Sequence, residues 1–342
     1  MEKELNVAVV GATGMVGQKM IEVLIERNFP FTGLKLLASS RSAGQAIKVG
    51  GEEYRVEEVS PQSFEDVDYA FFSAGETISK EFGPEAARRG TVVIDNSNAF
   101  RMEEEVPLVV PEVNPNAAFK HKGIIANPNC STIQMVAALQ PLQKEVSIKR
   151  VVAATYQAVS GAGREAVKEL KEQCRDYLDG KPVLAEYIPR KGAERNYQIA
   201  FNMVPQLDVF EENGYCKEEM KMVRETRKIM DLPDLPVTAT TVRVPVVNGH
   251  SIALNVELTG NLTAEEARTL FRKAPGITVV DNPEILEYPM PLDADGNDPV
   301  YVGRIRPDHS VKHGLNLWVV ADNIRKGAAT NSIQIAELLL SS

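Results

Sequence analysis

The sequence predicts a two-domain α/β protein: a Rossmann-like, doubly wound parallel sheet domain followed by an α+β domain with a mixed, largely antiparallel sheet. Its 342 residues exceed the usual size of one domain. Short, mainly apolar runs recur over the first 129 residues, as expected of a parallel sheet covered on both faces. Apolar residues alternate with other residues in later segments, as expected of antiparallel strands with one buried face.

The first domain is assigned to residues 1–129. Leu5 to Val10 form an apolar run that is followed at once by a glycine-rich turn at 11–17 and a helical pattern, so strand, turn and helix succeed one another. The other expected strands of this sheet cover residues 34–38, 69–73, 92–94 and 124–126.

The second domain is assigned to residues 130–323. It is expected to contain helices at 132–142 and 164–178, and strands at 149–155, at 252–258, at 315–320 and around Val242, Val244 and Val246. A last helix, at 327–340, carries apolar residues that need a partner. We expect the C-terminal segment 324–342 to pack back on the first domain.

Composition narrows the classes of partner. A formal charge of −9 disfavours nucleic acid and acidic membrane surfaces, and no apolar stretch approaches the roughly 20 residues of a membrane span. Three cysteines without a disulfide pattern suggest a reducing compartment, so we expect a cytoplasmic protein. His309 and His313 are spaced like a metal pair, but no third ligand accompanies them, and no metal is expected.

The turn at 11–17 predicts a dinucleotide site. Its glycine spacing permits a tight turn, close backbone approach to a pyrophosphate and close helix packing, and the helix start offers N–H groups to the anion. An NAD site usually has a carboxylate after the second strand, where this chain reads Ser39, Ser40 and Arg41. Two hydroxyls and a guanidinium suit a 2′-phosphate and favour NADP. A solvated loop charge is the alternative interpretation of Arg41. The residues of the turn assigned to the cofactor are Gly11, Thr13, Gly14, Met15, Val16 and Gly17.

Cys130 is the candidate nucleophile. It stands just before the apolar helical run that begins at Ile133, where a helix N-terminus favours the thiolate, and a nearby cationic imidazole is expected to add to this effect. Cys174 and Cys216 are expected to be small buried hydrophobes. Among the histidines, His250 follows an Asn-Gly turn and opens a strand, so it could be held rigidly.

Five ordered motifs resemble the aspartate-semialdehyde dehydrogenase family, nearly from end to end. They are GATGMVG at 11–17, NPNCST at 127–132, QAVSGAG at 157–163, RVPV at 243–246 with His250, and DN at 322–323 with KGAA at 326–329. The resemblance implies NADPH reduction of L-aspartyl 4-phosphate to the 4-semialdehyde and inorganic phosphate, a step in lysine, methionine and threonine biosynthesis. It also implies that the second domain is catalytic and forms a homodimer.

The resemblance further assigns roles to residues. Cys130 would form a thioester served by His250 as acid and base, while Gln157 orients the substrate, Arg243 takes its α-carboxylate and Glu218 its amine. Phosphate would bind Arg101 and Lys221, with Asn98 as a neutral donor; for Glu218 and Lys221 a solvated helix face is the alternative interpretation. The remaining residues that the resemblance assigns to the cofactor are Ser73, Ala74, Gly75, Ser160, Gly161 and Asn323.

Two other functions stay open at this stage. An N-acetylglutamyl-phosphate reductase would share the nucleotide domain and the Cys–His chemistry but would accept a blocked amine. A non-catalytic NADP-binding redox sensor would use Cys130 only as a switch.

Overall fold

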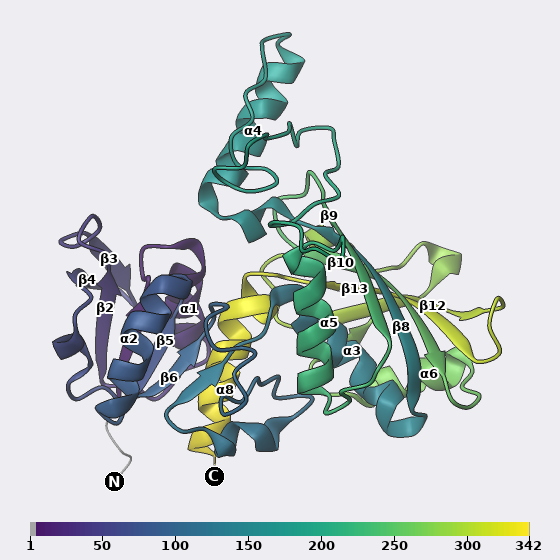
Figure 1. Ribbon diagram of the computed structural model, residues 1–342, viewed down its shortest axis with the longest axis horizontal. Helices are drawn as coiled ribbons and strands as arrows, with labels where there is room; N and C mark the ends of the chain where they lie inside the picture. The colour runs from purple at the N-terminus through teal and green to yellow at the C-terminus, as the bar shows by residue number, and fades with distance from the viewer. Residues whose placement is uncertain (1–4, 342) are drawn as a thin grey trace. The chain divides into compact units, whose positions relative to one another are not determined.

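The computed structural model describes residues 5–341, which form two compact units (Figure 1). Residues 5–129 and 328–341 make up the first unit, and residues 130–327 make up the second. Each unit has its own sheet and its own hydrophobic core. The predicted fold class is confirmed.

The first unit is built on a seven-stranded sheet in the order β3-β4-β2-β1-β5-β6-β7. Strands β1 (Asn6–Val10), β2 (Gly33–Ala38), β5 (Tyr69–Phe72), β6 (Val92–Asp95) and β7 (Ile124–Ala126) are parallel to one another and coincide with the apolar runs of the sequence. Val7 and Val9 lie in one core cluster with residues of α1 (Met15–Glu26) and α8 (Thr330–Leu340). Ala8 and Val10 lie in the opposite cluster with α2 (Glu76–Arg88). The sheet is thus covered on both faces.

Strands β3 (Ala46–Val49) and β4 (Glu52–Glu58) were not predicted. They form an antiparallel hairpin, and β4 extends the sheet as a parallel neighbour of β2. The turn is made by Gly50 and Gly51, whose φ angles of 59° and 96° suit glycine. Most side chains of the hairpin are exposed, so its sequence lacks the apolar run that revealed the other strands.

The second unit is built on a six-stranded mixed sheet in the order β11-β12-β13-β10-β8-β9. Its strands are β8 (Ile148–Gln157), β9 (Val237–Arg243), β10 (His250–Leu258), β11 (Ile277–Val279), β12 (Val300–Asp308) and β13 (Gly314–Ala321). The pairs β8–β9 and β11–β12 are parallel, and the other three are antiparallel.

The strand expected around Val242 ends earlier than its alternation indicated. Strand β9 stops at Arg243, and Val244 and Val246 lie beyond it. Pro245 lacks an N–H and cannot continue the ladder. The Val246 N–H instead donates to the Val244 carbonyl at 2.8 Å, which turns the chain.

Three helices pack on this sheet: α3 (Cys130–Glu145), α5 (Lys217–Ile229) and α6 (Ala264–Lys273). Inward residues of β8, such as Val151 and Ala153, join the core with Met135 and Leu139 of α3. Val152, Ala154 and Tyr156 alternate with them and remain only partly buried or exposed on the opposite face.

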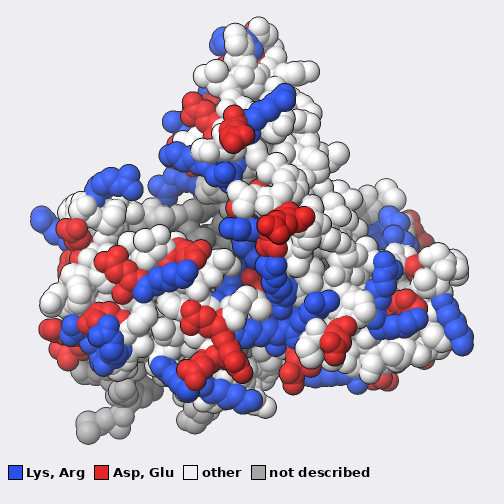
Figure 2. Space-filling model, viewed as in Figure 1, with Lys and Arg blue, Asp and Glu red and all other residues white. Residues whose placement is uncertain are grey.

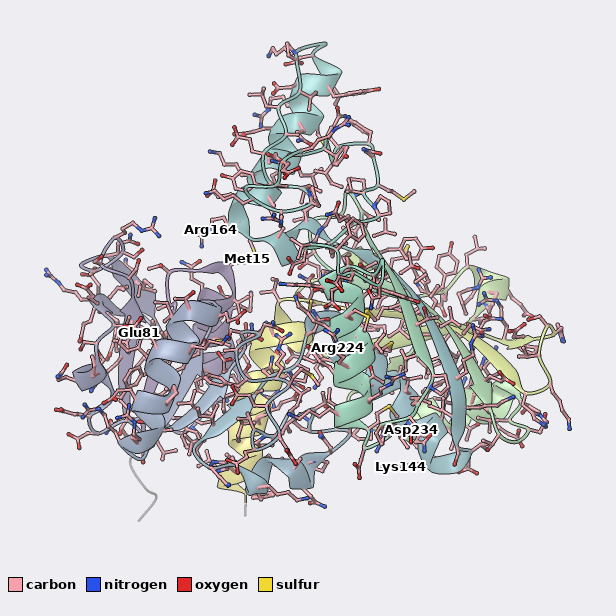
Figure 3. All side chains as sticks on the ribbon, in the orientation of Figure 1. Met15, Glu81, Lys144, Arg164, Arg224 and Asp234 are labelled. Atoms are coloured by element: carbon pink, nitrogen blue, oxygen red, sulfur yellow. The ribbon has the colours of Figure 1, made fainter. Side chains whose placement is uncertain are left out.

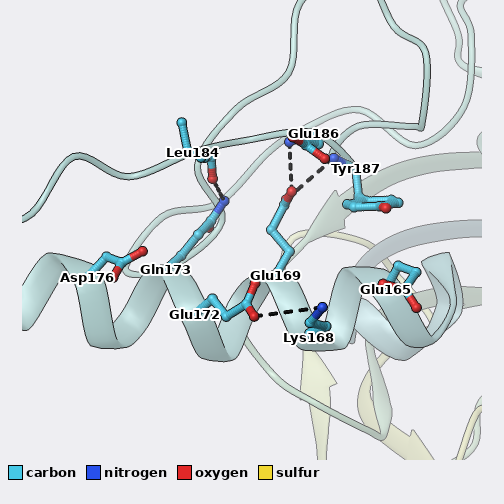
Figure 4. A pocket seen from close by; sticks show the side chains of 9 residues that line it. All are labelled: Glu165, Lys168, Glu169, Glu172, Gln173, Asp176, Leu184, Glu186 and Tyr187. Atoms are coloured by element: carbon cyan, nitrogen blue, oxygen red, sulfur yellow. Dashed lines mark hydrogen bonds and ion pairs between the residues drawn. The ribbon is translucent and has the colours of Figure 1, made fainter.

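Helix α4 (Arg164–Leu178) projects from the rest of the second unit together with the chain that follows it (Figures 1 and 3). Beside it lies a pocket of about 180 Å³, lined mainly by charged residues (Figure 4). Glu169 in this pocket is tied to the backbone, since it accepts hydrogen bonds from the Glu186 and Tyr187 N–H groups at 2.7 and 3.4 Å. None of the predicted site residues lines the pocket.

The C-terminal segment is helical, but its first turn differs from the prediction. A π-helical turn (Arg325–Ala329) precedes α8. Helix α8 then packs on α1 within the first unit. Across residues 5–341, no helix combines the length and apolarity needed to cross a membrane.

Candidate active site

Three predicted site residues meet at one end of the sheet of the second unit. Gln157 ends β8, Arg243 ends β9, and the two are paired across the parallel ladder. His250 opens β10, one residue before Ser251, which pairs with Tyr156 of β8. Gln157, Arg243 and His250 are all buried. The ladder therefore brings an amide, a guanidinium and an imidazole side by side.

Cys130 is the first residue of α3 and is half-buried. This placement confirms that the thiol lies at a helix N-terminus, where the helix dipole favours an anion. Gly327 lies against it: a Cβ atom at Gly327 would come within 2.8 Å of the Cys130 Cβ. Only glycine fits at residue 327 without displacing the thiol.

Arg243 supplies the positive charge that acts on Cys130. Its Nη1 donates to the Ala158 carbonyl at 2.6 Å, and its buried Nε has no hydrogen-bond partner among residues 5–341. Burial lowers the pKa of the guanidinium, while the negative charges of Glu218 and Cys130 raise it. Because this coupling is mutual, Arg243 favours the thiolate form of Cys130.

His250 is neutral in this site. The Ala158 N–H donates to its Nδ1 at 3.1 Å, so the ring proton is on Nε2, which is buried and has no partner among the described residues. Burial, and then the charge of Arg243, lower the pKa of His250 to about 3. The expectation of a cationic imidazole beside the thiol is therefore wrong: the cation is Arg243, and its proximity disfavours a second positive charge.

The low pKa of His250 predicts a loss of stability in acid. The imidazole pKa is 6.5 in an unperturbed chain and about 3 in the native protein, so between these values the unfolded state binds the extra proton. Stability then rises with pH, and acidification from pH 6.5 to about pH 5 costs about 2 kcal/mol of unfolding free energy. Denaturant unfolding at about pH 7.5 and about pH 5 measures this loss. His250→Asn should remove it, and equal pH dependence in both proteins would contradict the assignment.

Glu218 and Lys221 both belong to α5, over which basic side chains gather in Figure 2. Glu218 is buried, and Gln157 donates to its Oε1 from Nε2 at 3.4 Å. Lys221 Nζ lies 3.1 Å from the other carboxylate oxygen and 3.7 Å from Asp208. The alternative of a solvated helix face is wrong for Glu218, whose carboxylate lies beside Gln157.

Ser160 and Gly161 lie in a short 3-10 helix after β8 (Val159–Ala162), and Asn323, which follows β13, lies beside them. Asn323 Nδ2 donates to Ser160 Oγ at 2.9 Å. A Cβ atom at Gly161 would lie 2.9 Å from Arg243 Nη1 and 3.3 Å from His250 Nε2. The absence of a side chain at 161 therefore leaves room beside two buried donors.

In the first unit the glycine turn is packed tightly against the backbone around it. Gly11 has φ 87°, and a Cβ there would lie 2.9 Å from the Ser73 backbone. A Cβ at Gly17 would lie 2.2 Å from the Gly11 carbonyl oxygen, so helix and turn are in contact. Gly14 caps α1, which begins at Met15 (labelled in Figure 3). Thr13 belongs to the same turn and Val16 to the first turn of α1. Ala74 and Gly75 lie in the turn that follows β5.

The residues proposed for the 2′-phosphate follow β2 and are exposed. The Ser39 carbonyl accepts from the Ser42 N–H at 2.9 Å, which turns the chain directly after the strand. Ser39, Ser40 and Arg41 occupy this turn with their side chains accessible. The turn itself offers two hydroxyl donors and one positive charge.

Arg101 is buried and held by the backbone. Its Nε donates to the Asn127 carbonyl and its Nη2 to the Asn96 carbonyl, both at 2.9 Å. Asn98 lies in the same loop and is exposed. The guanidinium is thus fixed in direction before any ligand arrives.

Comparisons with known proteins agree with this arrangement. The sequence matches two family models, described as the semialdehyde dehydrogenase NAD binding domain over residues 6–121 and the semialdehyde dehydrogenase dimerisation domain over residues 139–326. Aspartate-semialdehyde dehydrogenase of Bacillus subtilis (strain 168) is 54% identical over 340 residues, which cover 99% of this chain and 98% of that protein. The chain belongs to the aspartate-semialdehyde dehydrogenase family.

Other members of the aspartate-semialdehyde dehydrogenase family match the chain over nearly its full length. The enzyme of Aquifex aeolicus (strain VF5) is 54% identical, with 98% of each chain covered. A structure of aspartate semialdehyde dehydrogenase II from Vibrio cholerae, complexed with ASA, superposes with a TM-score of 0.94 at 47% identity, covering 100% of this chain and 99% of that one. The enzyme of Candida albicans, solved with NADP, has a TM-score of 0.75 at 26% identity, with 99% of each chain covered.

Sequence reasoning missed two contributors to this aspartate-semialdehyde dehydrogenase site. The Ala158 backbone binds both His250 and Arg243, a role that no side chain reveals. Gln134, one helical turn after Cys130, donates from Nε2 to the His250 carbonyl at 3.3 Å. Its spacing of four residues from the thiol on α3 was a signal that could have been followed.

Proposed function

We propose that the chain converts L-aspartyl 4-phosphate and NADPH to L-aspartate 4-semialdehyde, phosphate and NADP, a step towards lysine, methionine and threonine. Family membership supports the reaction class. The observation that carries the residue assignments is that Gln157, Arg243 and His250 meet, buried, at one end of the sheet, with Gln157 bonded to the Glu218 carboxylate. A buried guanidinium, a thiol and a carboxylate in one site suit an activated amino acid, which carries an α-carboxylate, an acyl carbon and an amine.

Cys130 is the acyl carrier in this proposal. Its thiolate attacks the acyl carbon, the bond from that carbon to the phosphate oxygen breaks, and a thioester remains. When bound, the dinucleotide supplies the hydride for reduction of this thioester. Collapse of the thiohemiacetal on Cys130 then expels the thiolate and releases the aldehyde. His250, with its proton on Nε2, is placed to donate to the developing oxyanion and to recover the proton afterwards.

The substrate's own charges are matched by buried residues. Arg243 offers its guanidinium to the α-carboxylate, and Glu218 offers a carboxylate to the free amine. Gln157, which lies between them, orients the acyl group near the thiol. A blocked amine would leave Glu218 buried without that partner, which disfavours an N-acetylated substrate. We assign inorganic phosphate to Arg101 and Lys221, with Asn98 as a neutral donor.

The cofactor of the proposal is NADP, bound at the glycine turn and at Ser39, Ser40 and Arg41. Gly11 and Gly17 keep this turn tight, because a Cβ at either residue would collide with the backbone of Ser73 or Gly11. The start of α1 that follows offers N–H groups suited to a pyrophosphate. The Candida albicans relative was solved with NADP. The remaining assigned cofactor residues are Ser73, Ala74, Gly75, Ser160, Gly161 and Asn323.

Arg41→Glu should weaken NADP binding by roughly 10- to 100-fold, the value of one or two charge-assisted hydrogen bonds to phosphate. NAD has no 2′-phosphate, so its dissociation constant should change less than about threefold. Titration calorimetry with both cofactors measures the difference. Arg88→Glu, at an exposed arginine on α2 of the same unit, controls for the change in net charge. Equal weakening of NADP and NAD would refute the 2′-phosphate assignment.

Aldehyde oxidation tests the proposed activity. Purified protein with aspartate semialdehyde, NADP and phosphate should form NADPH, and omission of phosphate should reduce the steady-state rate by at least about 10²-fold, because the thioester then lacks its acceptor. N-acetylglutamate semialdehyde should be a poor substrate. Preference for the acetylated aldehyde would favour the other reductase, and absence of turnover with either would favour a redox sensor.

We also propose that the chain forms a homodimer through its second unit. Val152, Ala154 and Tyr156 line the sheet face away from α3, and the Tyr156 and Trp318 rings meet there at 5.5 Å. A partly exposed apolar sheet face of this kind needs a cover, and the matching family model is described as a dimerisation domain. Light scattering should give twice the chain mass.

A further inference from the structure

The segment from Asp322 to Gly327 contacts both the thiol and the turn that precedes His250. We propose that Asp322 is a positioning residue, whose buried carboxylate fixes this segment and thereby the separation of Cys130 and His250. The inference rests on the proposed function, because it assigns Asp322 a purpose only if these two residues react together.

The Asp322 carboxylate is fully engaged by backbone donors. Its Oδ1 accepts from the Ile324 and Arg325 N–H groups at 2.7 and 2.9 Å. Its Oδ2 accepts from the Gly296 N–H at 2.8 Å. The Asp322 carbonyl also accepts from the Gly327 N–H at 3.0 Å, which closes the segment into a loop. One buried residue therefore determines the course of the chain up to Gly327.

One end of this loop determines where the thiol lies. The missing side chain of Gly327 lets the backbone lie directly against Cys130, since a Cβ there would come within 2.8 Å of the Cys130 Cβ. The backbone at 327 thus limits where the Cα and Cβ atoms of Cys130, and with them the thiol, can lie. A loop that moved outward would leave Cys130 free to change its position at the start of α3.

The other end of the loop determines where the imidazole lies. Asn323, next to Asp322, accepts at Oδ1 from the Gly249 N–H at 2.9 Å. Gly249 has φ 87°, and a Cβ there would lie 2.9 Å from the Pro291 backbone, so this turn is held on two sides. His250 follows at once. The loop therefore fixes both the residue proposed to carry the acyl group and the residue proposed to donate a proton to its oxyanion.

Asp322→Asn removes one acceptor without changing size. An amide oxygen can keep the Ile324 and Arg325 N–H groups, but the amide nitrogen is itself a donor and no longer ties the Gly296 N–H to this segment. We expect kcat to fall by roughly 10- to 100-fold, because small misplacements of reacting groups cost this much. KM should change less than about threefold, since Arg243 and Glu218, which are proposed to bind the substrate, belong to β9 and α5 and not to this segment.

Non-additivity distinguishes positioning from a general loss of stability. Gly327→Ala should also lower kcat, because its Cβ displaces the thiol, and the double variant with Asp322→Asn should lose far less than the product of the two effects. Asp281→Asn is the matched control: this carboxylate is also buried in the second unit and accepts from the Arg268 Nε at 2.7 Å and the Ile305 N–H at 3.2 Å. It should lower the thermal midpoint, leave kcat unchanged, and combine with Gly327→Ala additively.

Two results would overturn the inference: an Asp322→Asn enzyme with kcat within about threefold of wild type, or effects at Asp322 and Gly327 that multiply as the control pair does. If Asp322→Asn does not fold, Asp322→Ser keeps a hydroxyl acceptor near Ile324 and Arg325 but cannot reach Gly296, and the same loss of kcat is expected. Cys130→Ala is measured alongside. If that variant remains active, the proposed function fails rather than the role of Asp322.

Discussion

Cys130→Ala is expected to lower kcat by roughly 10⁴- to 10⁶-fold while the protein still binds NADP, because covalent catalysis cannot begin without the nucleophile. The cofactor residues of the first unit are unchanged by this substitution, so the NADP dissociation constant should stay within about twofold. Stopped-flow measurement of NADPH formation, with calorimetry for NADP, tests both statements.

Cys174→Ala is the matched control for the loss of a thiol. Cys174 lies on α4 and is half-buried like Cys130, but it is not at a helix start and no proposed site residue contacts it. Its removal should leave kcat unchanged. A Cys130→Ala enzyme with more than a hundredth of the wild-type rate would place the nucleophile elsewhere.

Arg243→Leu is expected to lower kcat/KM for aspartate semialdehyde by roughly 10²- to 10³-fold. Loss of one partner of a buried, charge-assisted pair costs about 3–4 kcal/mol, and here the substrate carboxylate is that partner. Arg243→Lys keeps the charge but not the planar fork, so it should recover only part of the loss. The Cys130 thiol should also react more slowly with iodoacetamide in Arg243→Leu, because the guanidinium charge favours the thiolate.

A substrate without the carboxylate separates these two effects of Arg243. 3-Aminopropanal lacks the carboxylate that Arg243 is proposed to bind, so it should already be a poor substrate of the wild-type enzyme. Arg243→Leu should then cost this aldehyde much less than it costs aspartate semialdehyde. Equal losses for both aldehydes would show that Arg243 acts on the thiol alone.

Most of the fold was predictable because its core strands are locally distinctive. Strands buried on both faces are mainly apolar, and β1, β5 and β6 show this in sequence, apart from Asn6 and Asp95 at strand ends. The β3–β4 hairpin was missed because its exposed residues alternate without a clear apolar face. The extent of β9 was wrong because Pro245 ends the ladder although the valines continue to alternate.

The site was predictable only in part, for a physical reason. A thiol before an apolar helical run can be recognised in the sequence, because a helix start is a local feature. The protonation of His250 cannot, because it depends on burial and on Arg243, which approach through β8–β10 pairing and the Ala158 backbone. Glu218 is similar: its neighbours along α5 are charged, and only the fold places it against Gln157.

Acylation of Cys130 is the most direct measurement of the central claim that this thiol carries the substrate. The protein is incubated with aspartate semialdehyde and NADP in the absence of phosphate, quenched in acid and digested. The mass of the peptide that contains Cys130 is then measured by mass spectrometry. We predict one aspartyl group on Cys130, formed together with one equivalent of NADPH and lost when phosphate is added before the quench. NADPH formation with Cys130 unmodified, or with the acyl group on another residue, would contradict this claim.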